Sequence, residues 1–186
     1  MNEVYLETDR LRLREFTADD VELLVELESD PEVMRFLTGQ PTPRHQIADV
    51  TLPAILKRYA EHPGLGTFAA HQKADGAFVG WFGLQPTDVP DTVDVGYRLN
   101  RTAWGKGYAT EGTRALIAKA FTDLGLQRVV ADTMAVNHRS RAVMRRAGLR
   151  FVKLYHEHFD DPLPGSEFGE VLYAIDRATW EAGCHG

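Results

Sequence analysis

The 186-residue sequence has a single cysteine, Cys184, and it lacks the long apolar runs of membrane proteins. One cysteine cannot form an internal disulfide framework, so the composition predicts a cytoplasmic protein. Charged and apolar residues alternate through residues 1–14, which is unlike the apolar core of a signal peptide. No stretch approaches the roughly 20 consecutive apolar residues that a membrane-spanning helix needs. We therefore expect no membrane partner.

The sequence also lacks an excess of basic residues, since its formal net charge is -6 at pH 7. Proteins that bind nucleic acids without regard to sequence usually carry a basic face, so we do not expect a nucleic-acid partner. The acidic balance is compatible with a cationic substrate such as an amine, although a solvated acidic surface is its more common meaning. A hydrophobic content of 44% with 26% charged residues is typical of a globular domain, and we expect a single domain over residues 1–186.

The spacing of apolar residues changes several times along the chain. Alternating patterns predict strands, whereas apolar residues three and four apart predict helices. We expect strands over residues 6–14, 66–71, 78–84, 92–99, 128–133, 149–159 and 168–175, and helices over 17–27, 31–36, 42–61, 107–124 and 137–147. Consecutive strands favour antiparallel pairing, and the strand–helix–strand unit in the middle favours one parallel pair. The expected fold class is α/β (α+β), a single mixed and mostly antiparallel sheet of six to seven strands flanked by helices.

The connection between the strand at residues 92–99 and the next helix carries two glycines, Gly105 and Gly107. Glycine allows a positive φ and lets a ligand approach the backbone closely. The unpaired N–H groups and the dipole at a helix N-terminus favour an anion there. Lys106 adds a cation between the two glycines. The turn at residues 104–109 is therefore a candidate cradle for a pyrophosphate.

Other interpretations of this turn compete. A P-loop needs Ser or Thr directly after its Gly-Lys pair, but Gly107 follows Lys106. A dinucleotide-binding fingerprint needs a third glycine where this chain has Thr110, although Asp132 lies at a suitable distance for a ribose contact. A purely structural glycine-rich turn is a further alternative, because short glycine motifs are weak signals. The turn by itself identifies no ligand.

The residues around the turn are more specific. The run Val-Asp-Val-Gly-Tyr-Arg-Leu at 93–99, followed by Trp-Gly-Lys-Gly-Tyr-Ala-Thr-Glu at 104–111, resembles the central motif of the GNAT N-acetyltransferase superfamily. It is most similar to the ribosomal-protein N-terminal (alanine/serine) acetyltransferase branch. Gly107 and Ala109 fill the last two places of the family pattern Gln/Arg-x-x-Gly-x-Gly/Ala, and Trp104 stands in its first place. Residues 137–149 and the opening 6–14 resemble the same branch, so the resemblance covers nearly the whole chain.

The resemblance implies acetyl-CoA (coenzyme A) as cosubstrate and a GNAT-like fold with a splayed parallel strand pair at the cofactor site. The amides of the turn would hold the pyrophosphate, and the preceding strand would pair with the pantetheine arm. Asn137 would bond that arm in addition to capping its helix. Among the nearby arginines at positions 139, 141, 145 and 146, one or two would meet the 3′-phosphate. The expected cofactor-binding residues are Gly96, Tyr97, Arg98, Leu99, Trp104, Gly105, Lys106, Gly107, Tyr108, Ala109, Asn137, Ser140 and Arg141.

The implied reaction is direct attack of an amine on the thioester, which requires a base and an acid. Many family members carry a tyrosine seven residues after the motif asparagine, where this chain has Met144. Ser140, one turn earlier, is the candidate hydrogen-bond donor to the leaving thiolate, with helix capping as its alternative role. Asp94 is the favoured base. Glu111 is a further catalytic candidate whose alternative is an acidic residue in the first turn of a helix. Rivals as base are Asp132 and Glu157.

The sequence predicts no metal site, because His156 and His158 share one face of a strand without a recognisable third ligand. The expected activity is transfer of acetyl from acetyl-CoA to a primary amine, either a small molecule or a protein N-terminus, in a ternary complex. The alternatives are transfer of another acyl group such as succinyl, or a non-catalytic acyl-CoA sensor, which the methionine at position 144 favours. We expect residues 36–64 and 160–168 to form the acceptor site, and a homodimer is compatible with the resemblance.

Overall fold

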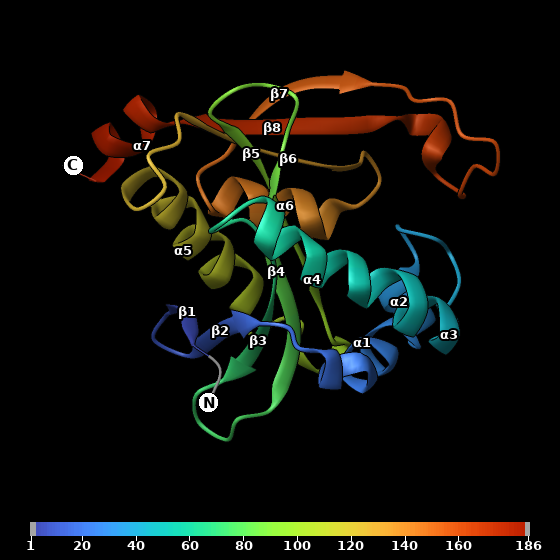
Figure 1. Cartoon of the computed structure of the whole chain (residues 1–186). Coiled ribbons are helices and arrows are strands. Elements are labelled where there is room, and N and C mark those ends of the chain that lie inside the picture. The colour runs from blue at the N-terminus through green and yellow to red at the C-terminus, as the bar shows by residue number, and fades with distance from the viewer. Residues whose placement is uncertain (1–2, 185–186) are drawn as a thin grey trace.

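The computed structural model describes residues 3–184 and contains one mixed sheet of eight strands (Figure 1). The strands are β1 (Val4–Glu7), β2 (Leu11–Glu15), β3 (Gly66–Gln72), β4 (Phe78–Pro86), β5 (Thr92–Leu99), β6 (Arg128–Met134), β7 (Arg150–Tyr155) and β8 (Glu170–Asp176). Their order across the sheet is β1-β2-β3-β4-β5-β6-β8-β7. Only β5 and β6 are parallel, and the other neighbouring pairs are antiparallel. The predicted mixed sheet with one parallel pair is confirmed.

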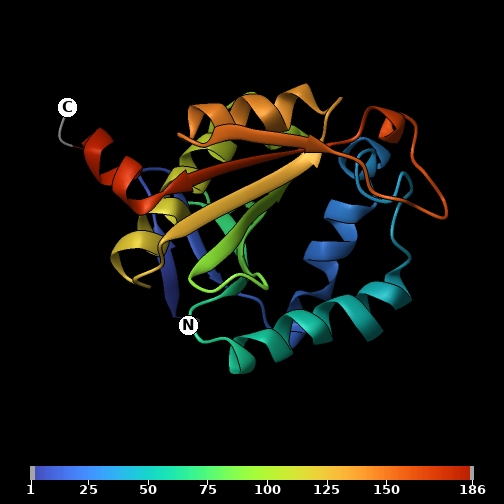
Figure 2. The ribbon, with the colours of Figure 1, turned by 90° about the horizontal axis from the view of Figure 1, so that it is seen from above.

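Helices cover both faces of the sheet, as the view from above shows (Figure 2). The helices are α1 (Val21–Glu28), α2 (Pro31–Met34), α3 (Arg44–Gln46), α4 (Leu52–Glu61), α5 (Tyr108–Thr122), α6 (His138–Arg146) and α7 (Arg177–Cys184). Shorter turns are η1 (Ala18–Asp20), η3 (Arg101–Ala103) and η4 (Ser166–Phe168), together with the π-helical η2 (Ile47–Thr51). We call the side that packs against α5 and α6 the α5 face, and the side that packs against α1 and α4 the α4 face.

Side chains alternate between these two faces along each strand. On β5, Val93, Val95 and Leu99 belong to the large core of the α5 face, which also contains Leu116 and Phe121 of α5. The smaller core of the α4 face joins α1, η2, α4 and β3. Because alternate residues of β5 enter the large core, those between them, Asp94 among them, lie on the α4 face.

The parallel strands β5 and β6 pair only at their beginnings. The paired positions are Thr92 with Arg128, Val93 with Val129 and Asp94 with Val130. Farther along, β5 continues beside β4 as far as Leu99, while β6 continues beside β8 as far as Met134. The two strands therefore diverge after Asp94, and this opening is the splay that the family resemblance implies.

Residues 6–14 form the hairpin β1–β2, although we predicted a single strand there. The Thr8 Oγ1 accepts a hydrogen bond from the Leu11 N–H at 2.9 Å, and the Thr8 N–H donates to the Leu11 carbonyl at 2.9 Å. These bonds close a turn over Asp9 and Arg10. Leucine and arginine alternate only over residues 10–14, and the four polar residues at positions 7–10, which interrupt the pattern, mark the turn. The sheet consequently has eight strands rather than six or seven.

The helical run predicted over residues 42–61 is divided into α3, η2 and α4. Pro53 has no N–H to donate, and the π-helical turn directly before α4 accommodates it. The last helix, α7, lies beyond the predicted elements. Within residues 3–184 no helix is both long and apolar enough to cross a membrane.

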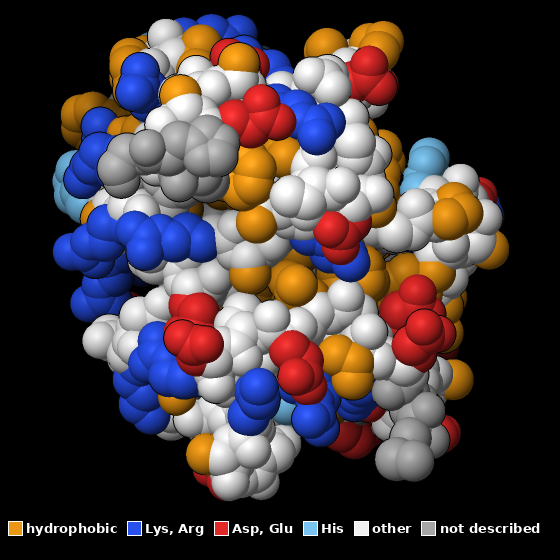
Figure 3. Space-filling view, turned by 90° about the vertical axis from the view of Figure 1, so that its left-hand side faces the viewer, with side chains coloured by type: hydrophobic (Ala, Val, Ile, Leu, Met, Phe, Trp, Pro, Cys, Tyr) orange, Lys and Arg blue, Asp and Glu red, His pale blue; other side chains and the backbone are white. Residues whose placement is uncertain are grey.

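Charges of both signs are mixed on the surface. Figure 3 shows Lys and Arg side chains gathered along one edge of one face, with Asp and Glu side chains interspersed over the rest. The net negative charge of the chain therefore does not form one continuous acidic surface on this face.

Candidate active site

The turn at residues 104–109 has the backbone that its glycines predict. Gly105 has φ +73° and Gly107 has φ +85°, in the left-handed region that favours glycine. Gly107 is the N-cap of α5, so the first amides of that helix lack intrahelical acceptors. A Cβ added at Gly105 would meet no atom within 4 Å. The turn is thus open to a ligand and has the geometry that anion binding at a helix N-terminus requires.

Trp104 holds this turn against the end of β5. Its indole Nε1 donates a hydrogen bond to the Leu99 carbonyl at 2.9 Å. The guanidinium carbon of Arg139, from α6, lies 5.2 Å from the centroid of the indole ring. The side chain therefore links the strand, the turn and α6, which accounts for a tryptophan in the first place of the motif.

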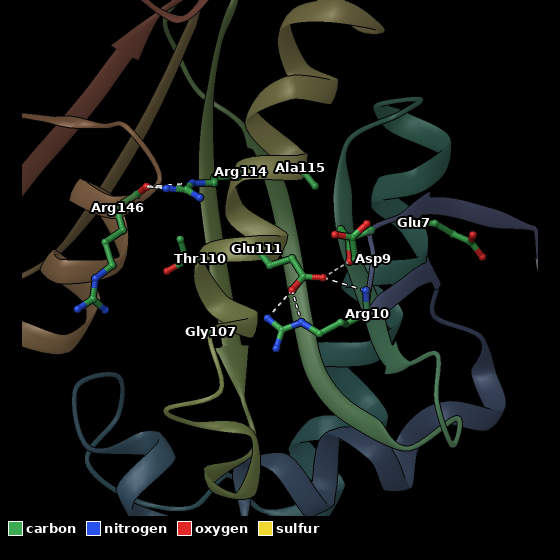
Figure 4. Close-up of a pocket in the computed structure, with 10 residues that line it drawn as sticks. Glu7, Asp9, Arg10, Gly107, Thr110, Glu111, Arg114, Ala115 and Arg146 are labelled. Carbon is green, nitrogen blue, oxygen red and sulfur yellow. Dashed lines mark hydrogen bonds and ion pairs between the residues drawn. The ribbon is translucent and has the colours of Figure 1, made fainter. Parts of the chain in front are cut away.

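Arg10, in the β1–β2 turn, supports the same turn from the other side (Figure 4). Its Nη1 donates to the Lys106 carbonyl at 2.8 Å, and its Nε donates to the Glu111 carboxylate at 2.7 Å. Arg10 was not predicted from the sequence, because 96 residues separate it from Lys106 and no local pattern connects them.

Glu111 is fully engaged in this network. Its carboxylate also accepts hydrogen bonds from Thr8 Oγ1 at 2.5 Å and from the Arg10 N–H at 3.0 Å. Burial opposes its ionisation, but the hydrogen bonds from Thr8 and Arg10 outweigh burial and lower the pKa of Glu111. A carboxylate with a low pKa and filled acceptor positions is a weak base. The structure therefore gives Glu111 an anchoring role in place of the catalytic role that we expected.

An open depression of about 760 Å³ lies beside the start of α5 (Figure 4). Arg10, Arg114 and Arg146 line it together with Gly107. The Nε of Arg114 donates to the Arg146 carbonyl at 3.0 Å, which connects α5 to the end of α6. The depression places three guanidinium groups next to the turn, together with the carboxylates of Glu7, Asp9 and Glu111. Arg114 is a second residue that was not predicted from the sequence.

Arg141, which we expected at the cofactor, is directed toward the sheet instead. Its Nη1 donates to the Ala135 carbonyl at 2.8 Å, and its Nε donates to the Tyr173 hydroxyl at 3.3 Å. Of the four arginines of α6, Arg139 stacks on Trp104 and Arg146 lines the depression beside Gly107. These two are therefore better placed than Arg141 for a phosphate at the turn.

Asn137, Ser140 and Tyr97 face the splay from the α5 face. The Asn137 Oδ1 accepts from the Ser140 N–H at 3.2 Å, which confirms the predicted helix cap, and its Nδ2 donates to Thr133 Oγ1 at 3.1 Å. Burial raises the pKa of Tyr97, and the neighbouring Ser140 side chain partly offsets this rise. Met144 is buried in the large core. The side chains of Tyr97, from β5, and Ser140, from α6, thus lie near each other beside the splay.

Asp94 lies on the opposite face, at the last paired position of β5 and β6. Burial raises its pKa to about 7, and the negative charge of Asp132 adds to the rise. Asp132 lies on β6, two residues beyond the partner of Asp94, and its Oδ2 accepts a hydrogen bond from the Tyr155 hydroxyl at 2.7 Å. A carboxyl group with a pKa near neutrality is well suited to accept a proton.

A cavity of about 280 Å³ lies on the α4 face next to Asp132. It is formed by the end of β6, the start of β8, the residues after α2 and the loop before β8. The lining residues are Phe36, Leu37, Asp132, Thr133, Met134, Phe159, Asp161, Leu163, Ser166 and Glu170. The cavity thus brings together both segments that we expected to form the acceptor site.

No group of three or more His, Cys, Asp or Glu side chains that could hold a metal ion is found in the described part of the chain. The candidate site of residues 3–184 therefore consists of backbone amides, hydroxyls, carboxyls and guanidinium groups.

Comparisons with known proteins agree with this geometry. Residues 10–150 match the family model of the acetyltransferase (GNAT) domain. The FsC-acetyl coenzyme A-N(2)-transacetylase of Aspergillus fumigatus is 38% identical over 184 residues, which cover 94% of this chain and 77% of that protein. The chain belongs to the GNAT acetyltransferase family, and it is an N-acetyltransferase.

Solved structures share the whole fold. The RimL ribosomal L7/L12 alpha-N-protein acetyltransferase in complex with coenzyme A is 18% identical, with a TM-score of 0.78 over 94% of this chain and 98% of that chain. The spermidine N-acetyltransferase of Vibrio cholerae in complex with CoA and spermine is 14% identical, with a TM-score of 0.76 over 94% and 99% of the two chains. At these identities the likeness establishes the fold.

Proposed function

We propose that the protein transfers acetyl from acetyl-CoA to a primary amine by direct attack in a ternary complex. The observation that carries this proposal is the arrangement around the splay. Asp94, with a pKa near 7, lies on the α4 face, and the hydroxyls of Tyr97 and Ser140 lie on the α5 face. A proton acceptor and hydroxyl donors thus flank the opening from opposite sides, as amine attack and thiolate departure require.

The residues present fit coenzyme A. The open turn at 104–109 would hold the pyrophosphate on its amides, and Arg139 and Arg146 would face the phosphates. The edge of β5 from Gly96 to Leu99, which diverges from β6, would pair with the pantetheine arm. Asn137 would bond the same arm. When bound, acetyl-CoA supplies the thioester that carries the acyl group.

In this proposal one protein residue accepts a proton from the amine and another stabilises the departing thiolate by a hydrogen bond. Asp94 accepts a proton from the ammonium form of the acceptor, directly or through water, and its raised pKa matches it to this task near neutral pH. The Ser140 hydroxyl, which interacts with Tyr97, donates a hydrogen bond to the departing sulfur. Backbone N–H groups of β5 polarise the thioester carbonyl.

Acetyl is the proposed acyl group because the name of the Aspergillus relative specifies acetyl coenzyme A. The titles of the structural relatives name both a protein and spermidine as acceptors, so they do not choose an acceptor class for this chain. A cytoplasmic location remains a prediction from the cysteine content.

The test is thiol release from acetyl-CoA and succinyl-CoA with a panel of primary amines, together with calorimetric CoA binding. We expect CoA binding and amine-dependent thiol release from acetyl-CoA. Tight CoA binding with no release for any amine would replace the proposal by an acyl-CoA sensor. Faster release from succinyl-CoA would overturn the choice of acetyl.

A further inference from the structure

The cavity beside Asp132 carries negative charge without a basic counterpart. Asp132, Asp161 and Glu170 line it, and none of its lining residues is Lys, Arg or His. Tyr155 donates one hydrogen bond to Asp132 at 2.7 Å, which leaves that carboxylate with further acceptor capacity. A group of carboxylates that share a confined space repel one another, and a cation in the same space relieves the repulsion.

Glu170 is the most unusual of the three. It lies at the first position of β8 and is only 9% exposed. Its carboxyl is affected by burial and by the negative charges of Asp132 and Glu157. Within residues 3–184 its side chain has no hydrogen-bond or ion-pair partner. Charged side chains are rarely buried without a partner, because the desolvation penalty is large. Glu170 is thus a largely buried residue whose carboxyl, unpaired within the described part of the chain, opens on the cavity, where a cationic ligand would supply the partner.

The rest of the cavity wall is apolar. Phe36 and Leu37 come from the segment after α2, and Phe159 and Leu163 come from the loop before β8. The two segments are in contact, since a Cβ added at Gly39 would lie 2.6 Å from the Leu163 Cδ2. A volume of about 280 Å³ is at the lower end of the range for small-molecule sites, which suits a compact ligand or one arm of a larger one.

We infer that this cavity is the acceptor subsite, that Glu170 and Asp132 bind the ammonium group of the acceptor, and that its apolar wall selects a compact amine with an apolar or aromatic body. The inference rests on the proposed function. The ammonium enters on the α4 face, the same side of the sheet as Asp94, so the bound amine lies toward the proton acceptor. A polycation has no large apolar body to place against Phe36, Leu37, Phe159 and Leu163, so it gains less from this wall than an aromatic amine.

Burial and the charges of Asp132 and Glu157 raise the pKa of Glu170 to about 7. Glu170 is therefore mostly ionised at pH 8, where the cavity binds a cation more tightly than it does below pH 7. Measurements at pH 8 give the clearest contrast between charged and neutral ligands of the same shape.

The test is calorimetric binding of phenethylamine and of its neutral counterpart phenethyl alcohol to the CoA-saturated protein at pH 8. We expect the amine to bind at least about tenfold more tightly than the alcohol, which corresponds to ~1.4 kcal/mol. Spermidine should bind more weakly than phenethylamine. Equal binding of amine and alcohol would overturn the role of the carboxylates, and tighter binding of spermidine would overturn the apolar selection.

Glu170→Gln should abolish the preference for the amine over the alcohol. The matched control is Asp176→Asn, which removes one negative charge from the exposed end of the same strand and should retain the preference. Glu170→Gln removes a buried carboxyl that has no partner, so it should fold with an unchanged or higher melting temperature. An amine preference that survives Glu170→Gln would contradict the inference.

Thiol release with the same amine separates this inference from the proposed function. If phenethylamine binds as expected but neither it nor any other amine of the panel releases thiol from acetyl-CoA, the subsite stands and the proposed function fails. If thiol is released at a rate that Glu170→Gln leaves unchanged, the function stands and the subsite assignment fails.

Discussion

The guanidinium of Arg10 forms an ion pair with the carboxylate of Glu111 at 2.5 Å while it donates a hydrogen bond to the backbone beside Gly107. One side chain of the N-terminal hairpin thus fixes both the first turn of α5 and the turn that precedes it. The guanidinium carbon also lies 4.6 Å from the centroid of the Tyr108 ring. The hairpin β1–β2 therefore supports the proposed pyrophosphate cradle.

Arg10→Ala should weaken CoA binding about tenfold, since hydrogen bonds that involve a charged group contribute roughly 1.5–3 kcal/mol. Loss of the guanidinium frees the Lys106 carbonyl and leaves Glu111 beside the anion site without its cation. Calorimetric titration with CoA measures the effect. Arg12→Ala, which removes an exposed arginine paired with Glu7 on the same hairpin, should leave the affinity within about twofold. Equal affinities of the two variants would argue against the support role.

Gly105→Glu should lower CoA affinity by at least about 100-fold, because it places a negative charge where phosphate is expected. Gly125→Glu is a matched control, since both glycines have a similar positive φ (+73° and +69°) and open space around a new Cβ. Both substitutions carry the same backbone strain and should lower the melting temperature by similar amounts. If Gly125→Glu weakened CoA binding as much as Gly105→Glu, the turn would not be the phosphate site.

Asp94→Asn should lower kcat at least about 100-fold, as expected for removal of a general base. A carboxyl with a raised pKa holds its proton more tightly in the folded state, so Asp94 reduces stability as the pH rises from about 4 to about 7. The asparagine variant should therefore melt at a higher temperature than the native protein at pH 8. A loss of activity accompanied by a loss of stability would point to a structural role.

The pKa of Asp94 should also determine how kcat depends on pH. At saturating amine, kcat should rise with pH through about 7 as Asp94 loses its proton. Asp132→Asn removes the neighbouring negative charge, so this rise should move to lower pH. An unmoved profile would exclude Asp94 as the titrating base.

Ser140→Ala and Tyr97→Phe should each lower kcat more than they raise the KM for the amine, because the two neighbouring hydroxyls lie beside the splay where the thiolate is proposed to leave. The double variant should be little slower than the slower single variant, since residues that act as a unit are not additive. Steady-state kinetics of the four proteins measure the coupling. Strictly additive losses would show that the two hydroxyls act independently.

Glu28→Ala should destabilise the fold by roughly 3–5 kcal/mol, because it leaves the guanidinium of Arg98 buried without its partner. Glu28 of α1 is 4% exposed and pairs with Arg98 of β5 next to Trp81. Glu22→Ala, which breaks the exposed pair with Arg44, should cost less than about 1 kcal/mol. Urea denaturation measures the free energy of unfolding of both variants. Similar losses of stability would contradict the interpretation that Glu28 and Arg98 form a buried ion pair.

The sequence alone determined the order of the elements from β2 to β8 and the position of the glycine-rich turn at residues 104–109. These features depend on local signals: apolar spacing sets β5 and α5, and positive φ requires glycine at 105 and 107. The cap by Asn137 is equally local, because an asparagine side chain reaches an amide three residues ahead. The hairpin β1–β2 was missed because its turn contains neither glycine nor proline, and the polar run at residues 7–10 was assigned to one continuous strand.

The tertiary structure decided which candidates share a site. Asp94 and Glu111 are both acidic and close to the turn in sequence, but packing buries Asp94 near Asp132 and places Glu111 against Arg10. Burial and opposing charges act through space, so the sequence could not separate a raised pKa from a lowered one. For the same reason the sequence could not predict that Arg10 binds the Lys106 carbonyl or that Glu170 lines a cavity. Both features depend on segments that are distant along the chain and are in contact only in the folded protein.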